Sequence, residues 1–310
     1  MNYFMLVLLY TYKCTSECDI CTFACSPERK EKLEKSVAKR LIEEAKENDI
    51  RLVGFAGGEP LLFKDEIIEL AGYCSSLGIA STITSNCFWG ETYEKALGVV
   101  KEMKEAGVNH LKISSDDFHS KVVPYENIKN VLIAAKKMKL KVVIGCTSLK
   151  NSGRLPGMLK NIQDYSLGVN ILEQTCYPVG RAAEKFDRDD FLYNLSFTDI
   201  CRDQGTITID PDGKAYPCGC MCGMIESREL GSIFKMNLCD IIKKAKENKH
   251  VEYISQHGID NYIEYIRENN LPIKIPQKVV DTCHMCYELF GKKENMPYLD
   301  VVIQKIKAID

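Results

Sequence analysis

The segment FMLVLLYTYKCTSECDIC, residues 4–21, joins an apolar run to three closely spaced cysteines. Residues 4–12 carry no charge and are rich in leucine and aromatic side chains, which predicts a strand buried on both faces of a sheet. The polar loop after this strand contains Cys14, Cys18 and Cys21 in the spacing C-x3-C-x2-C. Because parallel α/β proteins carry their sites at the carboxyl ends of the strands, we expect the chemistry of this chain to begin in this loop.

The alternation of short apolar runs with amphipathic stretches continues to about residue 180. Six parallel strands, each followed by a helix with Lys and Glu on its outer face, predict an α/β fold in the form of a partial (β/α)6 barrel similar to a TIM barrel. After the first strand, the predicted strands are residues 51–56, 80–84, 110–114, 141–146 and 168–174. The predicted helices are residues 31–47, 65–76, 92–106, 125–137 and 155–164.

The character of the sequence changes after the charged segment at residues 184–190. Residues 206–209 and 214–216 flank the turn sequence Asp-Pro-Asp-Gly and predict a hairpin, and the chain is predicted to be helical from Leu238 onward. We therefore expect two domains, a barrel over residues 1–190 and a small C-terminal domain over residues 191–310.

Composition narrows the classes of partner. A formal net charge of -2 leaves no excess of positive charge to neutralise nucleic acid or an anionic membrane surface. The apolar run at residues 1–10 has no basic segment before it and is shorter than the roughly 20 residues that span a bilayer as a helix. We expect a cytoplasmic protein that binds neither nucleic acid nor a membrane.

The chain contains 15 cysteines, and the cytosol keeps thiols reduced, so metal or redox chemistry explains them better than disulfides. Three thiolates in one short loop can bind three irons of a cubane cluster and leave the fourth iron open. Structural zinc is the alternative, although zinc sites usually close with four ligands in paired knuckles.

The three-cysteine loop, together with Gly57-Gly58-Glu59-Pro60 after the second predicted strand, resembles the radical S-adenosylmethionine superfamily. The resemblance implies a 4Fe-4S cluster on Cys14, Cys18 and Cys21, an S-adenosylmethionine cofactor, and anaerobic chemistry. It also implies that Gly57, Gly58, Glu59 and Pro60 bind the methionyl amino group. A tight turn is the simpler explanation for the two glycines taken alone.

Three further stretches fit the same cofactor pocket by resemblance. Ser85 and Asn86 after the third strand, and Ser114 with Asp116 after the fourth, stand where the family contacts the ribose and the methionyl carboxylate. Arg181, in the segment YPVGRA at residues 177–182, resembles a family arginine that pairs with that carboxylate. An ordinary loop contact is the alternative for each of them. His119 has no second ligand residue at helical spacing, and we expect it to be structural.

A second cysteine group resembles the auxiliary-cluster extension of peptide-modifying members of the superfamily, called SPASM or twitch. It has the spacing C-x11-G-x4-C from Cys201 to Cys218, followed by Cys283-x2-Cys286. No cysteine follows Cys286, so the resemblance implies one auxiliary 4Fe-4S cluster with all four irons bound by the protein. A zinc ribbon on the same four thiolates is the alternative.

The wider pattern resembles the short radical peptide epimerases that carry a single auxiliary cluster. It includes Cys21-x3-Cys25-Ser26-Pro27 and the segment SNCFWG at residues 85–90. In that family a cysteine directly after a cluster ligand returns hydrogen to the peptide. Gly219 stands at this position here, so we assign the donor role first to Cys220 and second to Cys222. A buried or spare-ligand cysteine is the alternative for both.

The resemblance implies an enzyme that abstracts a Cα hydrogen from a ribosomally made precursor peptide and converts L residues to D residues. The nearest alternative forms a thioether or C–C crosslink in the peptide. An alternative of a different class is a non-catalytic iron–sulfur or zinc protein for electron transfer or binding. The implied partners of the enzyme are the precursor peptide and a flavodoxin or ferredoxin that donates electrons.

Overall fold

The computed structural model describes residues 3–194, 200–201 and 205–308. The chain forms two compact units. The barrel unit contains residues Phe4–Leu192 and Ile209–Gly213, and the C-terminal unit contains Met1–Tyr3, Tyr193–Thr208 and Lys214–Asp310. Within the described residues, every helix is too short or too polar to cross a bilayer.

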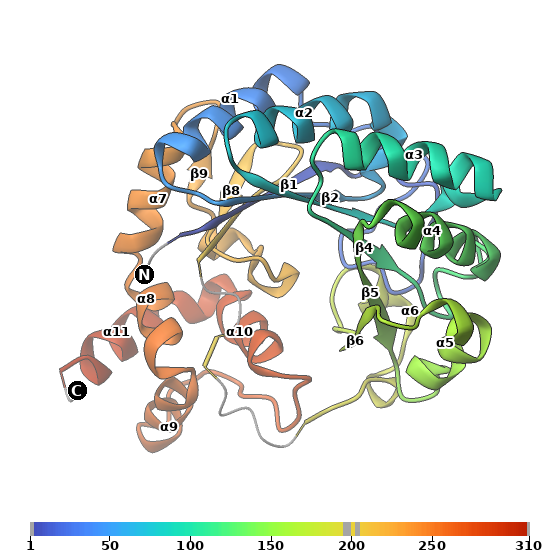
Figure 1. The fold of residues 1–310 in the computed structure, drawn as a ribbon. Helices are drawn as coiled ribbons and strands as arrows, with labels where there is room; N and C mark the ends of the chain where they lie inside the picture. The colour runs from blue at the N-terminus through green and yellow to red at the C-terminus, as the bar shows by residue number, and fades with distance from the viewer. Residues whose placement is uncertain (1–2, 195–199, 202–204, 309–310) are drawn as a thin grey trace. The chain divides into compact units, whose positions relative to one another are not determined.

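The barrel unit is built around parallel strands that pair in chain order, with helices on the outer face of the curved sheet (Figure 1). This confirms the predicted α/β fold of a partial barrel. The strands are β1 (Met5–Thr11), β2 (Leu52–Gly57), β3 (Ala80–Ser85), β4 (His110–Ser114), β5 (Lys141–Ser148) and β6 (Asn170–Thr175). The helices are α1 (Lys35–Glu47), α2 (Lys64–Ser76), α3 (Tyr93–Glu105), α4 (Tyr125–Met138), α5 (Arg154–Ile162) and α6 (Arg181–Lys185).

The strand register brings apolar side chains of neighbouring strands to the same level. Leu8 is level with Phe55, and Phe55 with Ile83. All three side chains are fully buried, as expected for a parallel sheet covered by helices. The same register places Thr11, at the end of β1, opposite Gly57 at the end of β2. The loops that follow these two strands therefore leave the sheet side by side.

Helix α1 begins at Lys35 rather than at the predicted residue 31, because the preceding residues pair with the end of β1. Lys32 forms an antiparallel bridge with Thr11, and the Leu33 amide donates to the Tyr10 carbonyl at 2.8 Å. These contacts pair the backbone of residues 31–33 with β1, so the first helical turn begins later than predicted. Likewise, Gly168 has a φ of +81°, so β6 starts two residues later than predicted, at Asn170.

The C-terminal unit contains short strands followed by helices. The strands are β7 (Thr206–Ile209), β8 (Lys214–Tyr216) and β9 (Gly231–Ser232), and β8 pairs antiparallel with β9. The helices are α7 (Leu238–Glu247), α8 (Lys249–His257), α9 (Asp260–Glu268), α10 (Thr282–Phe290) and α11 (Met296–Ile306). Tyr253, Tyr262 and Phe290 anchor a buried cluster contributed by helices α8 to α11. The unit therefore has a hydrophobic core of its own.

Candidate active site

Residues 12–34, between β1 and α1, form a long loop that we call the cysteine loop. It holds Cys14, Cys18 and Cys21, all half-buried. Burial, and then the charges that Cys14 and Cys21 would carry, raise the pKa of Cys18 to about 12. Burial also raises the pKa of Cys14 to about 11, with further contributions from Glu59 and Cys21. A hydrogen bond with the Cys25 thiol instead lowers the pKa of Cys21. The three sulfurs act on one another through charge, and a bound cation would stabilise all three thiolates.

Two glycines allow the chain at the end of β2 to lie close against the start of the cysteine loop. A Cβ on Gly57, whose φ is +126°, would lie 2.3 Å from the Thr11 carbonyl oxygen. A Cβ on Gly58 would lie 2.2 Å from the Lys13 carbonyl oxygen. The amides of Gly58 and Glu59 donate to these carbonyls at 2.6 and 2.9 Å. The Gly-Gly pair therefore joins the loops after β1 and β2, a role that sequence alone did not identify.

Glu59 lies at the centre of a buried network behind the cysteine loop. Its Oε1 accepts from the Leu61 amide at 3.0 Å, and its Oε2 accepts from the Asn86 amide at 2.8 Å and from Ser85 Oγ at 3.1 Å. Burial raises the pKa of Glu59 to about 7. Both carboxyl oxygens are thus engaged by the ends of β2 and β3.

Asn86 connects this network to the cysteine loop. Its Nδ2 donates to Thr15 Oγ1 at 2.9 Å and to Ser16 Oγ at 3.3 Å, and lies 3.8 Å from Cys14 Sγ. The structure therefore brings Glu59, Ser85 and Asn86 together with the cysteine loop.

Arg181, at the start of α6, holds the cysteine loop from its other side. Its Nη1 donates to the Cys18 carbonyl at 2.8 Å and its Nη2 to the Cys25 carbonyl at 2.9 Å. Its backbone amide donates to the Cys21 carbonyl at 3.0 Å. The side chain is only 8% exposed. The guanidinium, expected to pair with a cofactor carboxylate, is thus engaged with loop carbonyls, a tertiary contact that no sequence signal reveals.

Asp116, just after β4, pairs with His119. Asp116 Oδ1 lies 2.9 Å from His119 Nδ1 and also accepts from the Phe118 and His119 amides, while Oδ2 accepts from the Thr147 amide at 3.0 Å. Burial opposes the charge on each residue, but the pairing raises the pKa of His119 and lowers that of Asp116. The charges of Cys21 and Glu59 also raise the pKa of His119. The site therefore includes a histidine for which the sequence predicted only a structural role. The Asp-x2-His spacing was the available signal.

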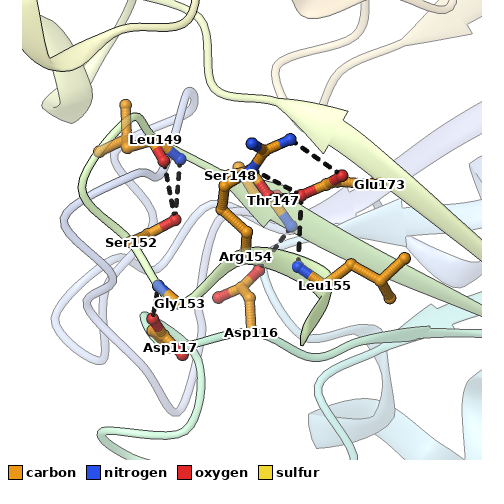
Figure 2. A network of polar contacts seen from close by, with 10 residues as sticks. All are labelled: Asp116, Asp117, Thr147, Ser148, Leu149, Ser152, Gly153, Arg154, Leu155 and Glu173. Carbon is orange, nitrogen blue, oxygen red and sulfur yellow. Dashed lines mark hydrogen bonds and ion pairs between the residues drawn. The ribbon is translucent and has the colours of Figure 1, made fainter. Parts of the chain in front are cut away.

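Polar contacts fix the loops after β4 and β5 beside Asp116, as Figure 2 shows. Glu173 on β6 accepts from Ser148 Oγ at 2.7 Å and from Arg154 Nε at 3.0 Å. Asp117 accepts from the Gly153 amide. Ser114, a predicted cofactor contact, is the last residue of β4. The ends of strands β1 to β5 therefore all contribute to one group of loops.

The C-terminal unit gathers a second set of thiols, which we call the C-terminal thiol site. The Cys220 thiol forms hydrogen bonds with Cys222 and Cys283, and both Cys218 and Cys222 act on it through charge. Cys286, on α10, is 6% exposed and interacts with Cys283. The pKa of Arg228 is raised by the charges that Cys286, Cys218 and Cys201 would carry. The site consists of Cys201, Cys218, Cys220, Cys222, Cys283 and Cys286.

The donor sets of the two groups suit iron–sulfur chemistry, since thiolates are the ligands of such clusters. The described residues contain no group of three or more His, Cys, Asp or Glu side chains that already surrounds a metal-sized position. The cysteine loop offers three thiols pinned through their backbone, and the C-terminal thiol site offers four or more. A cubane cluster held by the first set would have one iron unligated by protein, whereas the second set has enough thiols to ligate every iron.

A parallel partial barrel with a three-thiol loop after β1 and a Gly-Gly-Glu-Pro turn after β2 defines an iron–sulfur enzyme with its site at the strand ends. Residues 8–153 match the sequence profile of the radical SAM superfamily. The chain therefore contains a radical SAM domain, and it is an enzyme that uses S-adenosylmethionine and a 4Fe-4S cluster.

The relatives found by sequence include proteins of peptide metabolism. The chain is 27% identical over 303 residues to YydG of Bacillus subtilis (strain 168), a relative whose name assigns it to peptide biosynthesis, with 94% of each chain covered. It is 25% identical over 239 residues to the PqqA peptide cyclase of Xanthomonas oryzae pv. oryzae (strain MAFF 311018). That match covers 70% of this chain and 62% of the cyclase.

Solved structures show the same fold. Native anSMEcpe with bound AdoMet and Cp18Cys peptide matches with a TM-score of 0.59 at 14% identity, over 97% of this chain and 99% of that one. BtrN in complex with AdoMet and 2-DOIA matches with a TM-score of 0.53 at 14% identity, over 83% and 89% of the two chains. At this level of identity the likeness extends to the fold alone.

Proposed function

We propose that Cys14, Cys18 and Cys21 hold the radical SAM cluster and that the loops after β2, β3 and β4 bind S-adenosylmethionine. When bound, this pair supplies the superfamily's chemistry, in which one electron from the cluster cleaves the cofactor to a carbon radical. The proposal is supported by the charge interactions among the three thiols and by the backbone contacts of Arg181 and Gly58 that fix the loop.

We propose a ribosomally made precursor peptide as the substrate. The observation that carries this proposal is the match to YydG, which spans 94% of both chains and whose name refers to peptide biosynthesis. The PqqA peptide cyclase, a second relative, also acts on a peptide by its name. The superfamily assignment argues against the alternative of a non-catalytic electron-transfer protein.

We further propose that the reaction is epimerisation of L residues to D residues, with Cys220 as hydrogen donor and Cys222 as the second candidate. With the cofactor bound, the Cα hydrogen atom of the peptide residue would be removed, and the Cys220 S–H would return a hydrogen atom to the opposite face. The thiyl radical left on sulfur then regains one electron and one proton before the next turnover. A flavodoxin or ferredoxin would supply that electron, in a cytoplasm that keeps the remaining thiols reduced.

The burial of Cys220 supports this role. The side chain is 6% exposed, and its thiol contacts two other thiols rather than solvent. A buried S–H is protected from competing solvent oxidants, so it can keep its hydrogen for one substrate radical. Cys222 is more deeply buried, at 0% exposed.

We propose that Cys201, Cys218, Cys283 and Cys286 ligate one auxiliary 4Fe-4S cluster. Cys218 and Cys286 are buried, and Cys201 and Cys283 half-buried, in one neighbourhood of the C-terminal unit. A zinc ribbon on the same four thiolates is the alternative. Iron and zinc analysis of the reconstituted protein separates the two.

The second candidate reaction is formation of a thioether or C–C crosslink, which the match to a peptide cyclase favours. The test uses the full chain, a co-encoded peptide, S-adenosylmethionine and dithionite in D2O. Epimerisation keeps the atoms of the peptide and adds one carbon-bound deuterium per event. A product that has lost two hydrogens would instead establish crosslinking and refute epimerisation.

A further inference from the structure

Arg228, in the C-terminal unit, carries a buried charge that pairs with no carboxylate in the described part of the chain. It ends a short 3-10 helix, Glu226–Arg228, and its side chain is 8% exposed. Its Nε is buried and has no hydrogen-bond partner among the described residues. No described Asp or Glu lies within ion-pair distance of this guanidinium. Because arginine stays protonated in proteins, the charge must be offset by other anions.

The groups around Arg228 that can become anionic are mainly cysteine thiols. Its Nη2 donates to Cys286 Sγ at 3.2 Å. The charges that act on the guanidinium belong first to Cys286, then to Cys218 and Cys201, and next to Tyr262. These three cysteines are among the four proposed ligands of the auxiliary cluster. The influence is mutual, because burial raises the pKa of Cys286 while Arg228 lowers it.

The packing holds the guanidinium in this place. Its Cζ lies 4.6 Å from the ring centroid of Phe290, a fully buried residue at the end of α10. Cys286 is on the same helix, one turn earlier. The arginine therefore stacks on one residue of α10 and donates to another, which a flexible lysine ammonium would not reproduce.

We propose that Arg228 is the internal counter-charge of the auxiliary centre, which stabilises the reduced state of the cluster and orients Cys286. A 4Fe-4S cluster on four thiolates is anionic, and reduction by one electron makes it more so. A fixed positive charge and an N–H···S hydrogen bond both favour the added electron, since charge and hydrogen bonding at the sulfurs set cluster potentials. Arg228 is a positioning residue in this account, which rests on the proposed auxiliary cluster.

The test measures the reduction potential of the auxiliary cluster by EPR-monitored titration with dithionite. The full chain carries Cys14→Ala, Cys18→Ala and Cys21→Ala, so that only the auxiliary cluster reports. Arg228→Gln is expected to lower the potential, and Arg228→Lys, which keeps the charge but not the fork, to lower it less. Arg267→Gln, which removes an exposed arginine on α9, is the matched control and is expected to leave the potential unchanged.

A potential in Arg228→Gln equal to that of the parent would overturn the proposal. A second measurement needs no substitution at Arg228, in case that variant does not fold. The parent is labelled with 15N-arginine, and pulsed EPR of the reduced cluster is expected to show a nitrogen coupling that changes with the label. A spectrum insensitive to the label would also contradict the proposal.

Failure of the proposed auxiliary cluster would look different. The parent would then contain zinc or no metal in place of about four irons per chain. If the parent holds its irons but neither the potential nor the nitrogen coupling depends on Arg228, the cluster proposal stands and the counter-charge proposal alone fails.

Discussion

The cysteine loop takes its three thiols from one short segment after β1, whereas the C-terminal thiol site takes its six from segments spread over the last third of the chain. Each site is served by a buried arginine, but the two arginines act on different atoms. Arg181 donates to backbone carbonyls of the loop, and Arg228 donates to a sulfur. The charges of both arginines favour nearby thiolates, but Arg181 fixes the backbone of its loop, whereas Arg228 donates directly to a sulfur.

The largest expected difference between the two sites concerns cleavage of S-adenosylmethionine. Replacing any one of Cys14, Cys18 and Cys21 by Ala removes a ligand of the proposed radical SAM cluster, so 5′-deoxyadenosine formation is expected to fall to the level of the enzyme-free control. Cys239→Ser, at an exposed cysteine of α7, is the control and should keep full activity. Substantial cleavage by a loop variant would show that the three thiols do not form the reactive site.

The next largest effect separates cleavage from product formation. Cys220→Ala removes the proposed donor but leaves the cysteine loop intact, so 5′-deoxyadenosine should still form while the D residue does not. Cys222→Ala is expected to lower the yield of D residue less. Chiral amino-acid analysis of the hydrolysed peptide measures both. If the Cys220→Ala enzyme still made D residues at the rate of the wild type, Cys220 would not be the hydrogen donor.

A smaller effect concerns pH, because the barrel unit carries a buried carboxyl near its thiols. Burial raises the pKa of Glu59 to about 7 from an ordinary value of 4.5. The folded chain therefore holds this proton more tightly than the unfolded chain, so the group favours folding below about pH 4.5 and its contribution is lost as the pH rises to 7.

The loss is on the order of 3 kcal/mol of unfolding free energy. Urea unfolding of the cofactor-free chain at pH 5 and pH 8 measures it, with Glu59→Gln as the comparison. The wild type should lose more stability between the two pH values than the variant does. An equal loss in both would show that Glu59 titrates normally.

The smallest expected effect tests the arginine that shapes the loop. Arg181→Lys replaces a planar fork with a single ammonium, which cannot reach both the Cys18 and the Cys25 carbonyls. We expect a loss of about 2 kcal/mol in unfolding free energy and weaker retention of iron. Arg40→Lys, on the surface of α1, should change neither by a measurable amount. Unfolding curves and iron content measure the two effects. If Arg181→Lys changed neither of them, Arg181 would have no more than a surface role.

The strands and helices of the barrel were predictable because apolar runs and amphipathic stretches alternate clearly along the chain. The start of α1 was not, because Lys32 pairs with Thr11 through a contact that local propensity does not encode. The cysteine loop was equally visible in the sequence, since its three proposed ligands are spaced within one segment.

The partners of the buried arginines could not be read from the sequence, because each contact joins distant segments. Arg181 contacts a loop that lies, in sequence, more than half the length of the barrel unit away. Arg228 likewise contacts Cys286 on α10. The pairing of Cys220 with Cys283 is of the same kind. Sequence spacing therefore predicts local donor sets, while the charges that tune them emerge only from the fold.

The metal content of the cysteine loop tests the central claim most directly. The full chain is reconstituted anaerobically with iron and sulfide, reduced with dithionite, and examined by EPR with and without S-adenosylmethionine. The account predicts a cubane signal that changes when the cofactor is added and that disappears in the Cys14→Ala, Cys18→Ala and Cys21→Ala chain. Zinc bound at these three thiols, or the lack of any cluster signal that responds to the cofactor, would contradict it.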